Sequence, residues 1–427
     1  MLLVKYLREH TKEAIEGLSK RKLDAEGLIK DAINADDERI KLQQEKDEVL
    51  SESNQISSKI GDLYSKGEKD EAEKLKTESK VLKEKAGVLE ESFTNAEARL
   101  KDILMNIPNI PHGDVPAGKG DEDNEIFKEA QNMPDNIEGV PHWELAEEYN
   151  LIDFELGSKI TGAGFPVYLG QGAKLQRALI NFFLDSAVKE GYTEIEPPLM
   201  VNEESAFATG QLPDKEGQMY HVPVDNLYLI PTAEVPLTNL YRNVILNEDQ
   251  FPIKLTGYTP CFRREAGSYG KDVKGLNRIH QFDKVEIVQI QHPNESYKIL
   301  DEMRDYVENL LQQLELPYRI LKLCGGDLGT ASAFTYDMEV YSGAQEKWLE
   351  VSSISNFESY QANRLKLRFK DKESKKTQLA HTLNGSALAL PRIVASLLEN
   401  NQSKEGIKVP KVLHNYTNFD MILKSNS

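Results

Sequence analysis

The sequence is poor in the residues that several common architectures need. Its 427 residues include two cysteines, Cys261 and Cys324, too few for a disulfide scaffold or a multi-cysteine zinc cage and typical of a reducing compartment. No apolar run approaches the ~18 residues of a membrane-spanning helix, and the N-terminus predicts no secretory signal. Neither a GxGxxG motif nor a P-loop is present, so a doubly wound parallel sheet is not favoured.

Positive charge is also in short supply. The chain has 52 lysine and arginine residues against 70 aspartate and glutamate residues, which gives a formal net charge of -18. This excess argues against a protein that coats nucleic acid, although local basic surfaces can still contact a few phosphates. Its simplest meaning is solubility, and we expect a cytoplasmic protein without a membrane partner.

Proline is absent between residues 25 and 105. Apolar residues recur there in steps of three and four, the a/d pattern of a coiled-coil seam. Residues 61–69 contain two glycines, so we expect a hairpin of two helices, each about 60 Å long. A coiled coil used only for dimerisation is the alternative. The seam positions are Leu42, Val49, Ile56, Ile60 and Leu63, then Leu75, Ser79, Leu82, Ala86, Leu89, Phe93, Ala96 and Leu100.

A different composition begins after this hairpin. Pro108 and Pro111 end the second helix, and residues 106–125 read as a linker between an N-terminal domain (1–105) and a C-terminal domain (126–427). Short β-like runs then alternate with amphipathic helices, predicted at about 172–190, 294–314 and 386–400. The predicted fold is α+β: a long antiparallel helical hairpin, then a mainly antiparallel sheet flanked by helices.

Residues 262–286 predict a β-hairpin with a long basic loop that contains three glycines. Arg263 and Arg278 could face one another across it, with Glu265 and Glu286 beside them. Two guanidinium groups on one sheet face suit a polyphosphate, because each offers a planar fork of donors. A solvated, charged hairpin is the ordinary alternative.

Three shorter segments add weaker signals. On a strand, Thr232 and Glu234 would share a face, and a hydroxyl beside a carboxylate can hold an ammonium group. Glu350 and the serines after it offer the hard oxygen ligands that magnesium prefers. Arg392 follows a Gly-Ser turn in the first turns of the expected last helix, where a plain surface arginine is the alternative.

Taken in order, these segments resemble the signatures of class II aminoacyl-tRNA synthetases, and specifically the bacterial-type seryl-tRNA synthetase family. GYTEIEPPLM (191–200) resembles motif 1, with Pro198 at the motif proline. FRRE followed by RIHQF resembles motif 2, and NGSALALPR, which ends in Arg392, resembles motif 3. TAE and EVSS stand where seryl enzymes have their serine and ATP segments. The resemblance covers almost the whole chain, including the N-terminal hairpin.

The resemblance implies a homodimeric ligase with two reaction steps. L-Serine and ATP give seryl-adenylate and pyrophosphate, and the seryl group then passes to tRNA(Ser) and, in this family, to tRNA(Sec). The helical arm would reach across the dimer to the long variable arm of the tRNA, reading shape and backbone more than bases. The first step is an in-line attack on the α-phosphate, which depends on positioning and charge neutralisation.

The resemblance also implies a role for each motif residue. Arg263 would contact the α-phosphate, Glu265 the adenosine and Arg278 the terminal phosphates. Phe282 and Arg392 would sandwich the adenine ring. The implied catalytic residues are Arg263, Glu265, Arg278 and Arg392, and the implied ATP-binding residues are Arg263, Arg264, Glu265, Ile279, Phe282, Glu350, Val351, Ser352, Ser353 and Arg392.

For the amino acid and the metal, the resemblance implies two further sets. Glu286 would accept the hydroxyl or ammonium group of serine, so that alanine is rejected strongly. Glu350 and Ser353 would hold Mg²⁺ with ATP, and no zinc is expected. The implied serine-binding residues are Thr232, Ala233, Glu234, Glu286, Asn384 and Ser386.

The sequence departs from the family pattern at three positions. Ala387 and Pro391 stand in motif 3 where glycines are common, and Gly164 in TGAGF (161–165) replaces a basic residue. Two other functions compete with the main one. A synthetase-like ligase that charges a carrier protein would lack the arm and use zinc; a threonyl enzyme is disfavoured by the same lack of zinc ligands. A non-catalytic coiled-coil scaffold would not need the charged motif residues.

Overall fold

The computed structural model describes residues 1–133, 139–265 and 274–424. The chain divides into two compact units: residues 1–19 with 23–108, and residues 20–22 with 109–427. Each unit has its own set of buried apolar side chains.

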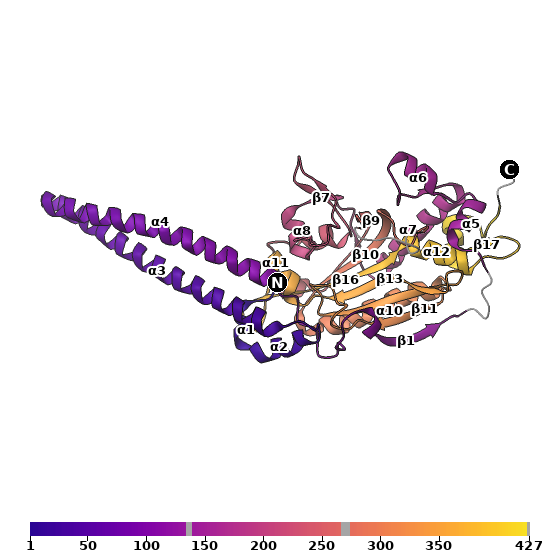
Figure 1. The fold of residues 1–427 in the computed structure, drawn as a ribbon, viewed down its shortest axis with the longest axis horizontal. Helices are drawn as coiled ribbons and strands as arrows, with labels where there is room; N and C mark the ends of the chain where they lie inside the picture. Colours follow the sequence, from indigo (N-terminus) through magenta and orange to yellow (C-terminus); the bar gives the residue numbers. More distant parts are fainter. Residues whose placement is uncertain (134–138, 266–273, 425–427) are drawn as a thin grey trace. The chain divides into compact units, whose positions relative to one another are not determined.

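Two long antiparallel helices, α3 and α4, make up most of the first unit and run side by side (Figure 1). Val49, Ile56, Leu89 and Phe93 of the predicted seam are buried, whereas Val88, which lies off the seam, is 65% exposed. The predicted helical hairpin is therefore confirmed. The helices of this unit are α1 (Val4–Glu9), α2 (Thr11–Ser19), α3 (Ala25–Lys66) and α4 (Lys69–Met105).

The turn between these helices is shorter than the sequence predicts. Helix α3 continues through Gly61 and ends at Lys66, and Gly67 closes it with a φ of 82° and an N–H bonded to the carbonyl oxygens of Leu63 and Tyr64. A single helical glycine costs about 1 kcal/mol relative to alanine. Packing against a partner helix offsets such a cost, so Gly61 does not break the helix.

An eight-stranded sheet forms the framework of the second unit. Its strand order is β1-β11-β12-β13-β16-β10-β9-β4, and all its strand pairs are antiparallel except β4 with β9. The predicted α+β fold with a mainly antiparallel sheet is confirmed. The strands are β1 (Glu125–Gln131), β4 (Thr193–Glu194), β9 (Ile253–Phe262), β10 (Gln281–Gln291), β11 (Tyr318–Lys322), β12 (Phe334–Ser342), β13 (Lys347–Asn356) and β16 (His381–Ala389).

Alternate residues of β10 face different surroundings, as the pleat requires. Val285 and Ile287 join the main core, which contains apolar side chains of α7, α10 and α12. Lys284 and Glu286 point to the other face, where they form a buried ion pair. The sheet thus separates a helix-packed core from a polar face. These helices are α7 (Gly170–Lys189), α10 (Ser296–Gln313) and α12 (Leu390–Asn400).

Shorter elements complete this unit, and within the described residues no helix is long and apolar enough to cross a membrane. The helices are α5 (His142–Glu148), α6 (Phe154–Ile160), α8 (Glu203–Thr209), α9 (Glu234–Asn239), α11 (Ser359–Leu365) and α13 (His414–Thr417). The strands are β2 (Ile152–Asp153), β3 (Val167–Tyr168), β5 (Met200–Asn202), β6 (His221–Val222), β7 (Leu227–Leu229), β8 (Ile245–Asn247), β14 (Arg368–Lys370), β15 (Thr377–Leu379), β17 (Ile407–Lys408) and β18 (Met421–Ile422).

Two local predictions were wrong. The segment that contains Thr232 is a turn, and Glu234 begins helix α9 rather than lying on a strand. The last helix begins at Leu390, not at Ser386, because β16 continues as far as Ala389. Strand β16 pairs with β13 as far as Gly385 and with β10 at Ser386 and Ala389, so tertiary contacts override the Gly-Ser turn signal.

Candidate active site

Buried polar side chains gather on the polar face of β10. Glu286 is 1% exposed, and its carboxylate lies 2.8 Å from the Lys284 ammonium group. The hydroxyl groups of Thr232 and Ser386 donate to the same Glu286 oxygen, over 3.3 Å and 3.4 Å. Three predicted serine-binding residues are thus in contact: Thr232 from a turn, Ser386 from β16 and Glu286 from β10. Such a carboxylate can accept further donors from a small polar ligand.

Glu234 adds a second carboxylate, placed by the first turn of α9. Its backbone N–H donates to Thr232 Oγ1 over 3.2 Å, and Gln361 Nε2 donates to Glu234 Oε1 over 2.7 Å. Burial raises the pKa of Glu234 to about 7; the hydrogen bond from Gln361 opposes this shift, and the charge of Glu286 adds to it. Asn384 also interacts with Glu234, so the cluster joins four elements. A group held in this way changes charge near neutral pH.

Strands β9 and β10 form the predicted hairpin, with Phe262 paired to Gln281. Each arginine lies beside a different residue of this region. The guanidinium group of Arg263 lies 5.3 Å from the ring centroid of Phe282, and Arg278 Nη1 lies 3.2 Å from Glu265 Oε2. Residues 266–273 of the basic loop lie outside the described residues.

A β-bulge sets the geometry of the expected metal-binding segment. Ser352 pairs with Met338 and Glu350 pairs with Glu339, so β13 contains one extra residue at this point. The extra residue puts Glu350 and Ser353 on one face, and Ser353 Oγ donates to Glu350 Oε1 over 3.2 Å. In a regular strand, residues three apart would point to opposite faces.

Asp337 lies beside this pair, directly across from Ser353 on β12. This carboxyl group was not among the predicted site residues. Burial raises the pKa of Asp337, and the charge of Glu350 adds to the shift. Among the described residues, Asp337 Oδ1 is one of the buried side-chain oxygens with no hydrogen-bond partner. Two carboxylates and a hydroxyl form a set of hard oxygen donors with spare capacity.

Arg392 connects three segments from its position in the first turn of α12. Its Nη1 donates to the carbonyl oxygen of Glu350 over 2.6 Å, and its Nε donates to the carbonyl oxygen of Asn277 over 3.3 Å. Nη1 also lies 3.9 Å from Glu350 Oε2. The start of α12 therefore holds the β13 segment and the described end of the β9–β10 connection together.

The departures in motif 3 cause no conflict in the fold. Ala387 is fully buried within β16 and its methyl group belongs to the main core. Pro391 occupies the first turn of α12, where a backbone N–H has no helical partner in any case. Neither residue has a positive φ, so neither position requires glycine.

Gly164 does serve a role that a larger residue could not fill. Its φ is +85°, and an added Cβ would overlap the ring of His280. Its carbonyl oxygen accepts from the backbone N–H of His280 over 2.8 Å. The TGAGF segment therefore supports the β10 side of the hairpin through its backbone.

The remaining expected residues lie among these groups. Ser352 Oγ donates to the Ser386 carbonyl oxygen over 2.6 Å, which joins the β13 segment to the Glu286 cluster. Three charged or polar neighbours were not predicted from the sequence: Lys284, Asp337 and Gln361. Lys284 could have been found, because it lies two residues from Glu286 on a predicted strand. Asp337 and Gln361 gave no local signal. Of the other predicted residues, Ala233, Ile279 and Val351 are buried, and the Arg264 backbone N–H donates to Gln218.

Comparison with known proteins first identifies the class. Residues 220–401 match the model of the tRNA synthetase class II core domain (G, H, P, S and T), and residues 1–111 match that of the seryl-tRNA synthetase N-terminal domain. The antiparallel sheet and its arginine-bearing hairpin are thus those of a class II aminoacyl-tRNA synthetase.

Individual relatives narrow the class to one family. The serine–tRNA ligase of Pelodictyon phaeoclathratiforme is 45% identical over 431 residues, which cover 100% of both chains. That of Salinibacter ruber is 55% identical over 329 residues, 77% of each. The crystal structure of seryl-tRNA synthetase from Pyrococcus horikoshii complexed with ATP matches with a TM-score of 0.89 and 33% identity, covering 100% of both chains. The chain belongs to the seryl-tRNA synthetase family.

Proposed function

We propose that this protein activates L-serine with ATP to give seryl-adenylate and pyrophosphate, and then transfers the seryl group to tRNA(Ser). One observation carries this proposal most directly. Phe282 and Glu286 lie four residues apart on one face of β10, about 14 Å along the strand. That span suits an adenylate with its base at one end and its amino acid at the other.

On the nucleotide side, the proposal gives each charged group one role. Arg263 neutralises the α-phosphate as charge develops there, and Arg278 contacts the terminal phosphates. Glu265 contacts the adenosine, and the Ile279 backbone lines the adenine site. The ring packs between Phe282 and the guanidinium plane of Arg392. Arg264, Val351 and Ser352 complete the set proposed to bind ATP.

We propose Mg²⁺ as the metal, held by Glu350 and Ser353. The hard oxygen donors and the unpartnered Asp337 oxygen beside them fit such an ion. When bound, Mg²⁺ would neutralise phosphate charge. The part played by the chain itself is to hold these oxygens on one face through the β13 bulge.

On the amino-acid side, Glu234 and Glu286 are proposed to bind the ammonium and hydroxyl groups of serine. Thr232, Ala233, Asn384 and Ser386 complete this set. Bound in place of serine, the amino acid alanine would leave a buried carboxylate without its hydroxyl partner. The free-energy cost of that exceeds the cost of losing a methyl contact. Threonine would need room for an additional methyl group beside Ser386 and Thr232, both of which already contact Glu286.

The proposal extends to partners and organisation. Helices α3 and α4 supply the tRNA-binding arm within a domain of residues 1–105, with a linker at 106–125 and the catalytic domain at 126–427. We propose tRNA(Sec) as a second acceptor. We also propose a homodimer formed through the motif 1 segment, which contains the edge strand β4. A cytoplasmic location fits its tRNA substrate and the two unpaired cysteines.

Serine-dependent ATP–pyrophosphate exchange without tRNA tests the activation step. We expect exchange with serine and little with threonine, alanine or proline. Arg263→Ala should lower kcat by about 10²–10³-fold, because a charge-stabilising group is lost. Arg368→Ala, at an exposed position of strand β14, is the matched control and should behave as the wild type. Exchange with another amino acid, or normal exchange by Arg263→Ala, would contradict the proposal.

A further inference from the structure

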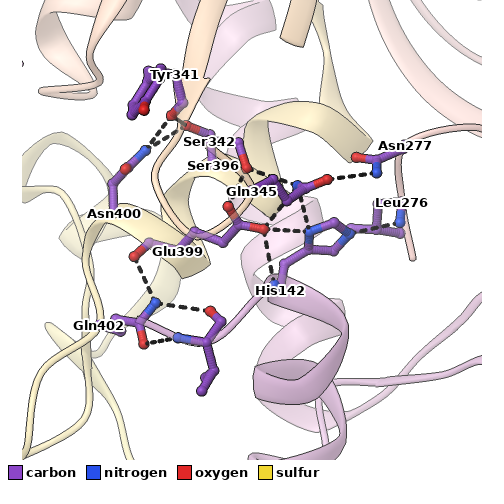
Figure 2. Close-up of polar contacts among 11 residues, drawn as sticks. His142, Leu276, Asn277, Tyr341, Ser342, Gln345, Ser396, Glu399, Asn400 and Gln402 are labelled. Atoms are coloured by element: carbon purple, nitrogen blue, oxygen red, sulfur yellow. Dashed lines mark hydrogen bonds and ion pairs between the residues drawn. The ribbon is translucent and has the colours of Figure 1, made fainter. Parts of the chain in front are cut away.

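A buried histidine–glutamate pair, His142 and Glu399, is not among the predicted site residues. His142 and Glu399 are both fully buried, and Figure 2 shows them at the centre of a polar network. His142 Nδ1 and Glu399 Oε1 are 2.7 Å apart, and the His142 backbone N–H donates to the same oxygen over 3.0 Å. The pair joins the start of α5 to the last turn of α12.

The second ring nitrogen fixes the tautomer. The backbone N–H of Leu276 donates to His142 Nε2 over 2.9 Å, so Nε2 carries no proton. A neutral ring then has its proton on Nδ1 and donates it to Glu399. Glu399 also accepts from Ser342 and from Gln345 Nε2. The imidazole is therefore an oriented acceptor for one particular backbone group.

That backbone group belongs to the returning limb of the β9–β10 connection, residues 274–280. The same network holds the next residue, because Asn277 Nδ2 donates to Gln345 Oε1 over 2.8 Å (Figure 2). The Asn277 carbonyl oxygen accepts from Arg392, and Arg278 follows directly. The segment that His142 holds thus contains Arg278 and accepts a hydrogen bond from Arg392, and both arginines are proposed to bind ATP.

The close approach of the ring to this limb depends on a glycine. Gly275 has a φ of +64°, and an added Cβ would overlap His142 Nε2. Lys274 adds a further contact, with its ammonium group 5.7 Å from the ring centroid of Trp143. His142 and Trp143, two consecutive residues of α5, therefore contact Leu276 and Lys274 of the limb.

We propose that His142, oriented by Glu399, is a positioning residue for ATP binding, which acts by holding the Leu276 N–H and thereby the limb that carries Arg278 and contacts Arg392. The inference rests on the proposed function. His142 itself is not proposed to touch the substrates. Substitution of His142 should weaken the binding of ATP but not that of serine. The proposed serine ligands Thr232, Glu234 and Glu286 belong to other segments.

Two substitutions separate this role from simple packing. The amide oxygen of His142→Gln can reach the position of Nε2, so this variant keeps an acceptor for Leu276 but loses the Nδ1 donor. The amide of His142→Asn can reach the position of Nδ1, so it keeps a donor for Glu399 and leaves Leu276 unpaired. If His142 served only to donate a hydrogen bond to Glu399, His142→Asn would change the ATP affinity less than His142→Gln.

The experiment measures ATP affinity by calorimetry and the KM values for ATP and serine by pyrophosphate exchange, with thermal unfolding as a check on folding. We expect His142→Asn to lower the ATP affinity by about 5- to 100-fold, because a buried N–H donor loses its acceptor. His142→Gln should stay within about threefold of wild type, and the serine KM should be unchanged in both. Equal effects of the two variants, or equal effects on ATP and serine, would overturn the inference.

Gly275→Ala tests the same contact from the loop if the buried substitutions prevent folding. The added methyl group would displace the limb from His142, so this variant should lower the ATP affinity as His142→Asn does. Wild-type ATP affinity in Gly275→Ala would overturn the inference. Failure of the wild type to exchange pyrophosphate with serine would instead count against the proposed function, because the ATP affinities of the variants are measured without it.

Discussion

At the scale of single residues, Glu234 gives the sharpest prediction. Its pKa of about 7 means that the unoccupied site holds a neutral carboxyl group below pH 7 and a carboxylate above it. An ammonium group binds the carboxylate better. The serine KM should therefore fall as pH rises from 5.5 to 7 and level off above that, with a limit of about tenfold per pH unit. Exchange kinetics across this range measure it.

Glu234→Gln removes the titration while keeping the shape. The serine KM should rise by about 10- to 100-fold, the range for a lost charged hydrogen bond, and should no longer vary between pH 5.5 and 7.5. The ATP KM serves as the internal control and should change little. A pH dependence of the serine KM that survives in this variant would assign the titration to another group.

Local sequence signals accounted for the motif residues but not for their surroundings. Arg263, Glu265 and Arg392 could be named because each belongs to a recognisable motif. The bulge that aligns Glu350 with Ser353 could not, since it follows from pairing with β12. Contacts between residues distant in sequence leave no periodic trace in either segment.

At the scale of elements, the hairpin was the easiest part to predict, because its seam repeats over many turns within one stretch of chain. The start of α12 was the hardest, because sheet pairing extended β16 through a Gly-Ser sequence. A long periodic helix can be predicted from its own sequence, whereas the end of a strand depends on the strands that pair with it.

The seam also predicts where the hairpin is vulnerable. Phe93 is 9% exposed, and the ammonium group of Lys46 lies 4.2 Å from its ring centroid. Phe93→Ala should lower the stability of the α3–α4 pair by about 3 kcal/mol, through lost burial and a cavity. Amide hydrogen exchange of residues 42–100 measures this. Val88→Ala, at an exposed position of the same helix, is the control, and an equal loss there would mean that the seam is misplaced.

At the scale of the whole molecule, the division into two units predicts that the two reaction steps can be separated. The motif residues all belong to residues 109–427, whereas the hairpin belongs to the other unit. Removing the outer part of the hairpin should therefore leave serine activation intact. Transfer to tRNA should fail, because the surface proposed to bind the variable arm is gone.

The structure indicates where to cut. Lys46 of α3 and Glu90 of α4 form an ion pair with 3.1 Å between Nζ and Oε2, so the two helices are adjacent there. Replacing residues 47–89 by a short glycine-containing turn should keep pyrophosphate exchange within about twofold of wild type, because no activation group is removed. Charging of tRNA(Ser) should fall by at least about a hundredfold, as expected when several phosphate contacts are lost together.

The two assays on one shortened protein make the outcomes distinct. Normal exchange with failed charging assigns the arm to tRNA and the sheet to activation. Loss of both activities, in a protein that unfolds at the wild-type temperature, would mean that the hairpin contributes to activation. Normal charging would show that tRNA recognition lies elsewhere, and the long helices would then need the alternative role of a dimerisation coiled coil.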